Sequence, residues 1–497
     1  MSNQQPHKTS DQSLASKLIQ GASIMVGGRV FIRLIGLVSV SITARLLTPE
    51  DFGVMGAASL VLVFFALFNK IGFEESILRM ESEDKSRLDT LWTIRLIIAV
   101  MIALLVFLFA PLMADLLQES RIQTVLYLMA STVIITAFHA PAVQILRKRL
   151  NFYKENELKV FNKLITVSLV LGFIYVEQTY MGMVYGQVAA AVAGIITSQL
   201  YYRYLPRFSL TYIKQELSFS LWTLIRNMSN YASGNADEWA AKRASSTAEF
   251  GAYHAAHDLS RLLVSEFLYP IGETFAAGIQ TVRHDHERLK RSVMRFLSVV
   301  MIMGFPIATG VALTSHEIVF IVLGDQWGAV TPYLPPIAFA LLGMVLSDLL
   351  FGIYVAMDKQ RRSAFVKFAR AILITLGSLL ALIYGDILFV AQVYCAIALG
   401  FVVIEYILLF RLLGLSFYHI PRIMIRPFLA SAVMAATLYF TLNLPDDMGL
   451  LVAAGVKVSL GVGVYTAVLF ILWLLSGKPK SGEQELFTRL MQILKRS

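Results

Sequence analysis

The sequence predicts an all-α, polytopic membrane protein of about fourteen transmembrane helices. Hydrophobic residues make up 57% of the 497-residue chain and charged residues only 15%, against about 25% charged residues in an ordinary soluble domain. Runs such as 97–110, 164–176 and 451–475 contain few or no charges. With their flanks they reach the roughly 20 residues that an α-helix needs to span hydrocarbon. Because these runs do not alternate polar and apolar residues, a membrane β-barrel is not expected.

The apolar runs define the spans along the chain. The expected spans are residues 19–46, 53–78, 90–114, 122–146, 157–176, 182–202, 218–241, 250–279, 292–313, 334–357, 364–384, 387–410, 424–442 and 449–475. The polar start MSNQQPHKTSDQSLASK lacks the basic region, short apolar core and cleavage site of a secretory signal. We therefore expect the first span to be retained as a helix.

The connections on the two sides of the membrane differ in their content of Lys and Arg. If the N-terminus is cytoplasmic, 28 of the 43 Lys and Arg residues lie in cytoplasmic connections and tails. Only Arg121, Lys242 and Arg243 lie in outer connections. This asymmetry follows the positive-inside rule, which predicts that both termini are cytoplasmic. The net charge of +10 then reflects topology and requires no nucleic acid partner.

A short motif occurs twice, in TARLLTPEDFG (43–53) and in KRASSTAEFG (242–251), at an offset of 198 residues. Six spans fill this offset, so we expect two six-helix halves and a terminal helix pair, an arrangement typical of transporters. Two unrelated helix caps are the alternative. The expected parts are a cytoplasmic segment at 1–18, an N-lobe at 19–206, a C-lobe at 207–413, helices 13 and 14 at 414–476, and a cytoplasmic tail at 477–497.

Each copy of the motif predicts the start of a helix at an outer turn. Thr48 is expected to cap the second helix, with Pro49 at its first position and Asp51 near its positive end. Ser246 and Glu249 are expected to form the corresponding capping box.

Two of the 28 cytoplasmic Lys and Arg residues, Lys367 and Arg426, lie at the cytoplasmic ends of spans, and twelve further Lys and Arg residues fall within the spans. Five of them lie a few residues inside cytoplasmic helix ends, where a long side chain can extend to the interface. We expect this snorkelling of Arg95, Lys159, Lys163, Arg295 and Arg370.

Four spans carry polar side chains at membrane depth. They are the first (Arg29, Arg33), the second (Asn69, Lys70, Glu74), the seventh (Arg226, Asn230, Ser233, Asp237) and the eighth (His254, His257, Asp258, Arg261, Ser265). An arginine at the bilayer centre costs roughly 2.5–3.5 kcal/mol even on the lenient insertion scale. These residues therefore predict a water-filled cavity or buried partners. Structural ion pairs, such as Arg261 with Asp237 or Lys70 with Glu74, are the alternative.

The carboxylates of spans seven and eight are candidates for ion coupling. A partly desolvated carboxylate binds protons more readily unless a cation offsets this effect, and the sequence contains no nucleotide-binding loop that would make ATP the energy source. We predict H⁺ or Na⁺ coupling at Asp237, His257 and Asp258, with His257 or Arg261 as the switching partner of Asp258. A permanent Asp258–Arg261 pair is the alternative.

Enzymatic functions are not expected. His284 and His286 lie in a charged run, RHDHER, which indicates a solvated connection. The sequence has no Asp-x-Asp pair for a metal-dependent sugar transferase, and its longest outer connection, 315–333, contains no Lys or Arg. We therefore predict no catalytic residue, no cofactor and no metal site.

The chain resembles a known family in four stretches. ARLLTPEDFGVMGAASLVLVFFALFNKIGFEESIL (44–78), ILRKRLNFYKENELK (145–159), EFGAYHAAHDLSRLLVSEFLYPIG (249–272) and IVFIVLGDQWGAVTPYLPPIAF (318–339) are similar to bacterial polysaccharide transporters. These are the lipid-linked oligosaccharide flippases, of the O-antigen type, in the multidrug, oligosaccharidyl-lipid and polysaccharide exporter superfamily. The resemblance extends over about residues 18–415. His254, His257 and Asp258 are more polar than the family pattern.

The resemblance implies two lobes around a cavity lined by helices 1, 2, 7 and 8. It also implies transfer of an undecaprenyl-diphosphate-linked oligosaccharide to the outer leaflet of a bacterial inner membrane, by alternating access. The expected diphosphate and sugar ligands are Arg29, Arg33, Lys70, Arg226, Asn230 and Arg261, and a polysaccharide polymerase is a further possible partner. A multidrug exporter of the same superfamily is the alternative within this class; a membrane-embedded polysaccharide polymerase or ligase is the alternative outside it.

Overall fold

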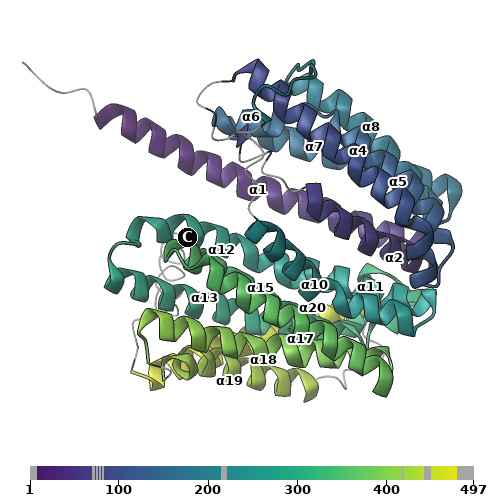
Figure 1. The fold of residues 1–497 in the computed structure, drawn as a ribbon. Helices are drawn as coiled ribbons and strands as arrows, with labels where there is room; N and C mark the ends of the chain where they lie inside the picture. The colour runs from purple at the N-terminus through teal and green to yellow at the C-terminus, as the bar shows by residue number, and fades with distance from the viewer. Residues whose placement is uncertain are drawn as a thin grey trace, which may run out of the picture. The chain divides into compact units, whose positions relative to one another are not determined.

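The computed structural model describes residues 8–69, 73, 76, 77, 80, 83–213, 221–416, 418–440 and 449–477. It divides into two compact units, Met1–Leu224 and Ile225–Ser497. All regular elements of the described residues are helices (Figure 1), as the composition predicted.

The described residues of the first unit form seven α-helices, of which α5 and α6 together correspond to one predicted span. They are α1 (Lys8–Leu46), α2 (Pro49–Ala66), α4 (Lys85–Leu116), α5 (Arg121–Ala137), α6 (Ala142–Lys148), α7 (Phe152–Glu177) and α8 (Tyr180–Tyr201), with the short η1 (Leu67–Asn69) after α2.

The second unit begins within α10 (Leu221–Ala244). Its helices continue as α11 (Thr247–Ser260), the π-helical η2 (Arg261–Ser265), α12 (Glu266–Ile279), η3 (Gln280–Val282), α13 (His286–Leu313), α14 (Ser315–Val322), η4 (Asp325–Val330), α15 (Leu334–Leu349), α16 (Phe351–Ala356), α17 (Gln360–Tyr384), α18 (Ile387–Leu413), α19 (His419–Phe440) and α20 (Leu450–Leu475).

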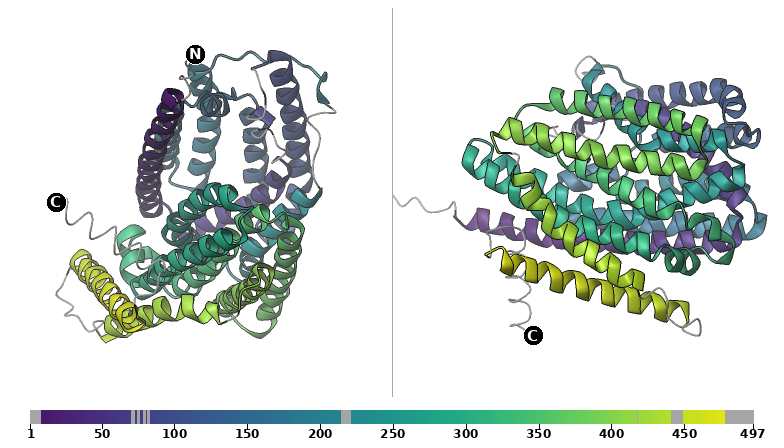
Figure 2. Two further views of the ribbon diagram at one scale, coloured as in Figure 1. Left: turned by 90° about the vertical axis from the view of Figure 1, so that its left-hand side faces the viewer. Right: turned by 90° about the horizontal axis from the view of Figure 1, so that it is seen from below.

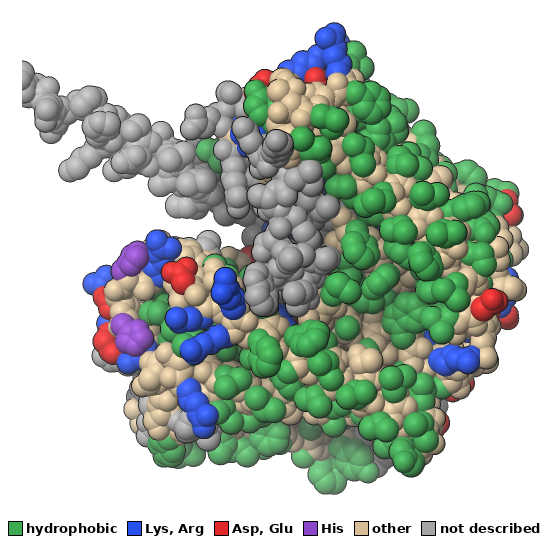
Figure 3. Space-filling model, in the orientation of Figure 1, with side chains coloured by type: hydrophobic (Ala, Val, Ile, Leu, Met, Phe, Trp, Pro, Cys, Tyr) green, Lys and Arg blue, Asp and Glu red, His purple; other side chains and the backbone are tan. Residues whose placement is uncertain are grey.

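Twelve segments of the described residues are long and apolar enough to cross a membrane. Two further helices of spanning length, α1 with 39 residues and α10 with 24, are not among the twelve. The polytopic helical fold is therefore as predicted, and the count of fourteen spans stays a prediction. On the face that Figure 3 shows, hydrophobic side chains predominate, and the charged and His side chains in view lie mostly toward its left, right and upper edges.

The turn between α1 and α2 has the predicted cap. Thr48 Oγ1 accepts from the Asp51 N–H at 3.2 Å, and Asp51 Oδ2 accepts from the Thr48 N–H at 3.0 Å. The other oxygen of Asp51 accepts from the Tyr180 N–H at 2.9 Å, so the same carboxylate also holds the start of α8.

The second copy of the motif forms only half of the predicted capping box. Ser246 Oγ accepts from the Glu249 N–H at 3.2 Å. The Glu249 carboxylate does not return a bond to the cap; it accepts from the Tyr333 hydroxyl at 3.2 Å instead. The predicted reciprocal box at this turn is therefore wrong, because a hydroxyl near the start of α15 takes the carboxylate.

Glycines allow close packing of α7 against α8 in the first unit. A Cβ atom at Gly182 would lie 2.7 Å from the backbone of Ile174, and one at Gly186 would lie 2.5 Å from the backbone of Val170. These contacts involve main-chain atoms, which cannot rotate away. Any larger residue would therefore force the two helices apart.

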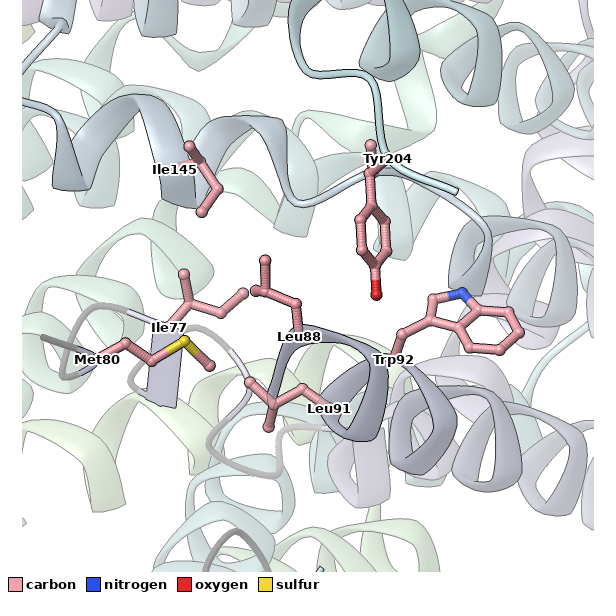
Figure 4. Packing of buried hydrophobic residues seen from close by; sticks show 8 residues of the cluster. Ile77, Met80, Leu88, Leu91, Trp92, Ile145 and Tyr204 are labelled. Carbon is pink, nitrogen blue, oxygen red and sulfur yellow. The ribbon is translucent and has the colours of Figure 1, made fainter. Parts of the chain in front are cut away.

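A buried cluster in the first unit joins the start of α4 to the break between α5 and α6. It contains Ile77, Met80, Leu88, Leu91, Trp92, Ala140, Ile145 and Tyr204. Figure 4 shows the Tyr204 ring extending toward α4 between Leu88 and Trp92. The Tyr204 hydroxyl donates to the buried Asp89 carboxylate at 2.8 Å, and the Arg207 N–H donates to the same oxygen at 3.2 Å. The segment that leaves α8 is thus fixed to α4.

A surface ion pair lies beside this cluster, outside the spanning segments. Arg149 Nε and Nη2 donate to the two oxygens of Glu83 at 2.7 and 2.6 Å. These bonds lower the pKa of Glu83 below its ordinary value of 4.5 and raise the pKa of Arg149. The pair connects the chain before α4 to the end of α6.

The terminal helix pair packs on α13 in the second unit. Ile302 of α13 contacts a buried group on α19 and α20 that includes Met434 and Tyr465. Figure 2 shows α19 and α20, in yellow-green and yellow, from two sides. Lys457 of α20 also forms a buried ion pair with Glu317 of α14.

Candidate functional site

The turn between α10 and α11 brings acidic residues of α10 next to histidines of α11. Asp237 and Glu238 are consecutive and buried, and the antiparallel return of the chain after Ser246 places His254 and His257 beside them. Both helices belong to the second unit almost entirely. We call the side chains of Asp237, Glu238, Tyr253, His254, His257, Asp258 and Arg261 the α10–α11 cluster.

The inner part of the cluster is a fully buried acid–imidazole pair. Asp237 Oδ2 lies 2.6 Å from His257 Nε2 and accepts from the Tyr253 hydroxyl at 2.7 Å. Asp237 Oδ1 and His257 Nδ1 have no hydrogen-bond partner among the described residues. On its other side, the His257 ring lies 5.9 Å from the ring of Tyr394, which belongs to α18 and is also buried.

The outer part of the cluster is a row of alternating acids and bases. Glu238 Oε2 lies 2.5 Å from His254 Nδ1, and His254 Nε2 lies 3.8 Å from Asp258 Oδ2. Asp258 Oδ1 in turn lies 3.6 Å from Arg261 Nη1. The side chains of Glu238 and His254 are 1% and 13% exposed, whereas those of Asp258 and Arg261 are 43% and 49% exposed. Glu238 Oε1 lies 3.7 Å from His257 Nδ1, so the row leads from the protein surface to the buried pair.

A π-helical turn begins at Arg261. Residues 261–265 form η2, which inserts one wider turn between α11 and α12. Such turns change the direction of the side chains that follow them and are frequent at functional sites. Here the wider turn begins at the residue that ends the acid–base row.

Only some of the predicted contacts among these residues are present. The Asp258–Arg261 pair, which was one of the two alternatives for Asp258, is formed. The pairing of Asp258 with His257 and the pairing of Arg261 with Asp237 are not: His257 binds Asp237, because both lie on the sides of α11 and α10 that face each other.

Sequence reasoning missed three members of the site. Glu238, Tyr253 and Tyr394 were not among the candidate residues. Glu238 could have been found from the sequence. It follows Asp237 in a predicted span, and every carboxylate at membrane depth needs a polar or cationic partner. Tyr394 could not have been found, since nothing in the sequence relates α18 to α11.

The remaining candidates are placed as follows. Arg29 and Arg33 lie one turn apart on α1, and both are partly buried. A Cβ atom at Gly28, beside Arg29, would overlap Asn156 of α7, so that face of α1 packs on α7. Asn230 is partly buried on α10, and its side-chain oxygen has no partner among the described residues. Arg226 lies in α10 but its side chain is not described, and Lys70 lies outside the described residues.

One prediction about the spans is wrong. Arg370 of α17 does not extend to an interface: the residue is 1% exposed, and its Nη2 atom lies 3.7 Å from the Asp348 carboxylate. The aliphatic part of the Arg370 side chain is enclosed by α15 and α18, so it cannot reach the membrane interface. The short distance of Arg370 from the end of its helix therefore did not predict its exposure.

The chemistry of the α10–α11 cluster suits the exchange of protons. It contains three carboxylates, two imidazoles and one guanidinium, joined by contacts of 2.5–3.8 Å. Imidazole is the side chain whose charge changes most readily near neutral pH. Among the described residues, no group of three or more His, Cys, Asp or Glu side chains is arranged to hold a metal ion.

Comparison with known proteins gives the family. Residues 42–332, more than half of the chain, match the model of a family described as polysaccharide biosynthesis proteins. The chain belongs to this family. It is 22% identical over 396 residues to the lipopolysaccharide biosynthesis protein WzxC of Escherichia coli K12, which covers 76% of this chain and 80% of WzxC.

Two further proteins are similar to this member of the polysaccharide biosynthesis family. The succinoglycan biosynthesis transport protein ExoT of Rhizobium meliloti is 22% identical over 448 residues, covering 87% of this chain and 89% of ExoT. The solved structure of the lipid II flippase MurJ in an inward closed conformation has a TM-score of 0.69 at 12% identity, covering 92% of this chain and 99% of MurJ. At that identity the likeness to MurJ establishes the fold alone.

Proposed function

We propose that this chain moves an undecaprenyl-diphosphate-linked oligosaccharide from the cytoplasmic to the periplasmic leaflet, by alternating access, for O-antigen or exopolysaccharide biosynthesis. The observation that carries the proposal is the family match over residues 42–332. ExoT is by name a succinoglycan biosynthesis transport protein, and MurJ, which shares the fold, is by name a lipid II flippase. The absence of an enzymatic motif from the sequence agrees with a transporter.

The substrate's diphosphate is the group that the arginines suit. A guanidinium binds phosphate through charge-assisted, bidentate hydrogen bonds that an ammonium group cannot make. We assign this contact to Arg29, Arg33, Arg226 and Arg261, with Lys70 as a further cation. Asn230, whose side-chain oxygen lacks a partner among the described residues, is assigned to sugar hydroxyls.

We infer that an ion gradient drives the cycle through Asp237, His257 and Asp258. The contacts within the α10–α11 cluster support this, because protonation of any member changes the charge that its neighbours experience. The ion is H⁺ or Na⁺; the imidazoles, which bind protons and not Na⁺, favour H⁺. The chain is a multi-pass membrane protein, and we place it in a bacterial inner membrane with both termini in the cytoplasm, near a polysaccharide polymerase.

The central test is transport by the purified protein in proteoliposomes. The substrate is an undecaprenyl-diphosphate oligosaccharide with a fluorescent sugar, and the readout is the fraction that an impermeant quencher can reach over time. We expect flipping that rises with an imposed ion gradient. Export of a cationic dye without flipping would favour the multidrug alternative. Growth of the sugar chain would favour the polymerase or ligase.

A further inference from the structure

A second group of charged side chains lies in the second unit, on α15, α17 and α18; three of its members are buried, and the side chain of the fourth, Asp348, is 28% exposed. Lys367 and Arg370 lie one turn apart on α17, Asp348 lies on α15, and Glu405 lies on α18. Lys367, Arg370 and Glu405 are 4%, 1% and 3% exposed. None of the four belongs to the α10–α11 cluster, and the proposed function gives no role to any of them.

The contacts within this group are unequally shared. Asp348 Oδ1 accepts from Lys367 Nζ at 2.7 Å and lies 3.7 Å from Arg370 Nη2, while Asp348 Oδ2 accepts from the Tyr269 hydroxyl at 3.1 Å. Glu405 forms no ion pair among the described residues, and its Oε2 atom has no hydrogen-bond partner there. Asp348 thus lies close to two cations, whereas Glu405 forms an ion pair with none of the described residues.

The guanidinium of Arg370 lacks hydrogen bonds within the part of the chain that the structure describes. All three of its guanidinium nitrogens lack a hydrogen-bond partner among the described residues. A buried guanidinium without hydrogen bonds is unfavourable. A second carboxylate that could accept hydrogen bonds from Arg370 would therefore also stabilise it. Arg370 lies 3.7 Å from Asp348 on α15, and its helix α17 packs directly on α18, which carries Glu405. The two acids therefore compete for one cation.

The surroundings of Glu405 contain few other charges. Among the described residues, the charged groups near Glu405 are Arg370 and Lys367 on α17 and Asp348 on α15. The Tyr354 hydroxyl on α16 is a further titratable group near it. Tyr406 follows it on α18, and its buried hydroxyl has no partner among the described residues. With Lys367 held by Asp348, only Arg370 is left to neutralise an ionised Glu405.

We propose that Glu405 binds and releases a proton during the transport cycle, with Arg370 moving between Asp348 and Glu405. When Glu405 holds the proton, Arg370 rests near Asp348, as in this structure. When the proton leaves to water, Arg370 pairs with the Glu405 carboxylate, and Lys367 alone neutralises Asp348. In the first state Lys367 and Arg370 share the carboxylate of Asp348, and in the second each acid has one cation. The inference rests on the proposed ion-coupled flipping and adds to it a second site of proton exchange.

Movement of Arg370 would act on helix packing. Asp348 belongs to α15 and Glu405 to α18. Helix α18 packs directly on both α15 and α17. Changing the partner of Arg370 shifts an attraction from α17–α15 to α17–α18. The proton at Glu405 would thus bias how these three helices sit against one another, which is what coupling of an ion to a conformational change requires.

The test compares Glu405→Gln with Tyr406→Phe in proteoliposomes, with flipping measured with and without an imposed pH gradient. Gln keeps the size of the side chain and removes its titration. Tyr406→Phe removes one oxygen from the next residue of the same helix. We expect at least a fivefold smaller gradient effect in Glu405→Gln, and a normal effect in Tyr406→Phe. Equal gradient effects in Glu405→Gln and the unsubstituted protein would overturn the proposal.

A second variant keeps the test decisive if Glu405→Gln does not accumulate in the membrane. Glu405→Asp retains a carboxyl group but moves it by one methylene, so we expect gradient-dependent flipping with a displaced pH profile. A pH profile identical to that of the unsubstituted protein would overturn the proposal. If the unsubstituted protein flips no lipid-linked sugar, the proposed function itself fails. If it flips without any gradient effect, only the ion coupling and this switch fail.

Discussion

The Nε2 atom of His257 lies 2.6 Å from the Oδ2 atom of Asp237, and neither side chain is exposed. The imidazole and the carboxylate come from neighbouring helices that the sequence separates by one short turn. Removing one member of a buried ion pair typically costs about 3–5 kcal/mol, because the other is left without compensation. The pair therefore constrains both the packing of α10 on α11 and the protons that the cluster can hold.

Asn in place of Asp237 should uncouple flipping from the ion gradient. Asp237→Asn keeps an acceptor for His257 and for Tyr253 but removes the charge, so we expect the gradient effect in proteoliposomes to fall at least tenfold. Tyr253→Phe is the matched control, since it removes one hydrogen bond to the same oxygen and no charge. If Asp237→Asn responds normally while Asp258→Asn does not, the coupling site is at the outer row of the cluster.

Reversal of charge at the proposed diphosphate ligands should abolish glycan export. We expect Arg29→Glu, Arg33→Glu and Arg261→Glu to lower export more than tenfold at normal abundance in the membrane, because each replaces an attraction for phosphate with a repulsion. Arg288→Glu is the control: it lies in the first turn of α13, its side chain is 68% exposed, and it should leave export unchanged. Normal export by Arg33→Glu would remove that residue from the site.

The topology can be checked by labelling a single cysteine. Cys395 is the only cysteine, so a Cys395→Ala background carrying Glu50→Cys has one thiol, in the first turn of α2 next to the α1–α2 connection. Since the distribution of Lys and Arg places this turn in the periplasm, an impermeant thiol reagent should label it in intact cells. A thiol placed at Asp285, in the α12–α13 connection, should stay unlabelled until the cells are opened. The reverse pattern would invert the proposed orientation.

The ion pair between Arg149 and Glu83 should contribute to stability only above acidic pH. Hydrogen bonds from Arg149 lower the pKa of Glu83 in the folded protein below its ordinary value of 4.5. Its stabilising effect is thus complete above 4.5 and is lost as the pH falls through the lower, folded-state value. We expect Glu83→Gln to lower the melting temperature more at pH 7 than at pH 3. An equal difference at both pH values would mean that packing, and not charge, explains the effect.

Much of the fold could be predicted because the membrane imposes simple rules on sequence. Most of the long apolar runs correspond to described helices within a few residues, and the cap at Thr48 has the predicted bonds. The largest exceptions are the first span, whose helix α1 begins at Lys8 and not near residue 19, and the second, whose helix α2 ends at Ala66. Local signals explain this success, since a span or a cap depends on residues that are neighbours in sequence. The break between α5 and α6 was missed because the apolar character of the run continues through it.

The partners of the charged residues were harder to predict. His257 lies on the same helix as Asp258 and one turn from Arg261, and the sequence favoured those neighbours over Asp237. Arg370 was expected at an interface because it lies near a helix end, but α15 and α18 enclose it. In both cases the outcome depends on how helices pack, which periodicity and charge counts do not specify. The pairs between helices are therefore where the structure adds most to the site.

The two copies of the capping motif should differ in their effect on stability. At the first turn Asp51 accepts hydrogen bonds from the N–H groups of Thr48 and Tyr180, and from the Thr48 hydroxyl at 2.6 Å. At the second turn Ser246 accepts one bond and Glu249 returns none to it. Loss of a single cap costs about 1 kcal/mol, so Ser246→Ala should lower the melting temperature slightly. Asp51→Ala should lower it several times further, because it also releases the start of α8. Thermal unfolding of the three proteins in one detergent measures this order, and equal shifts would show that the reciprocal bonds at the first turn add no stability.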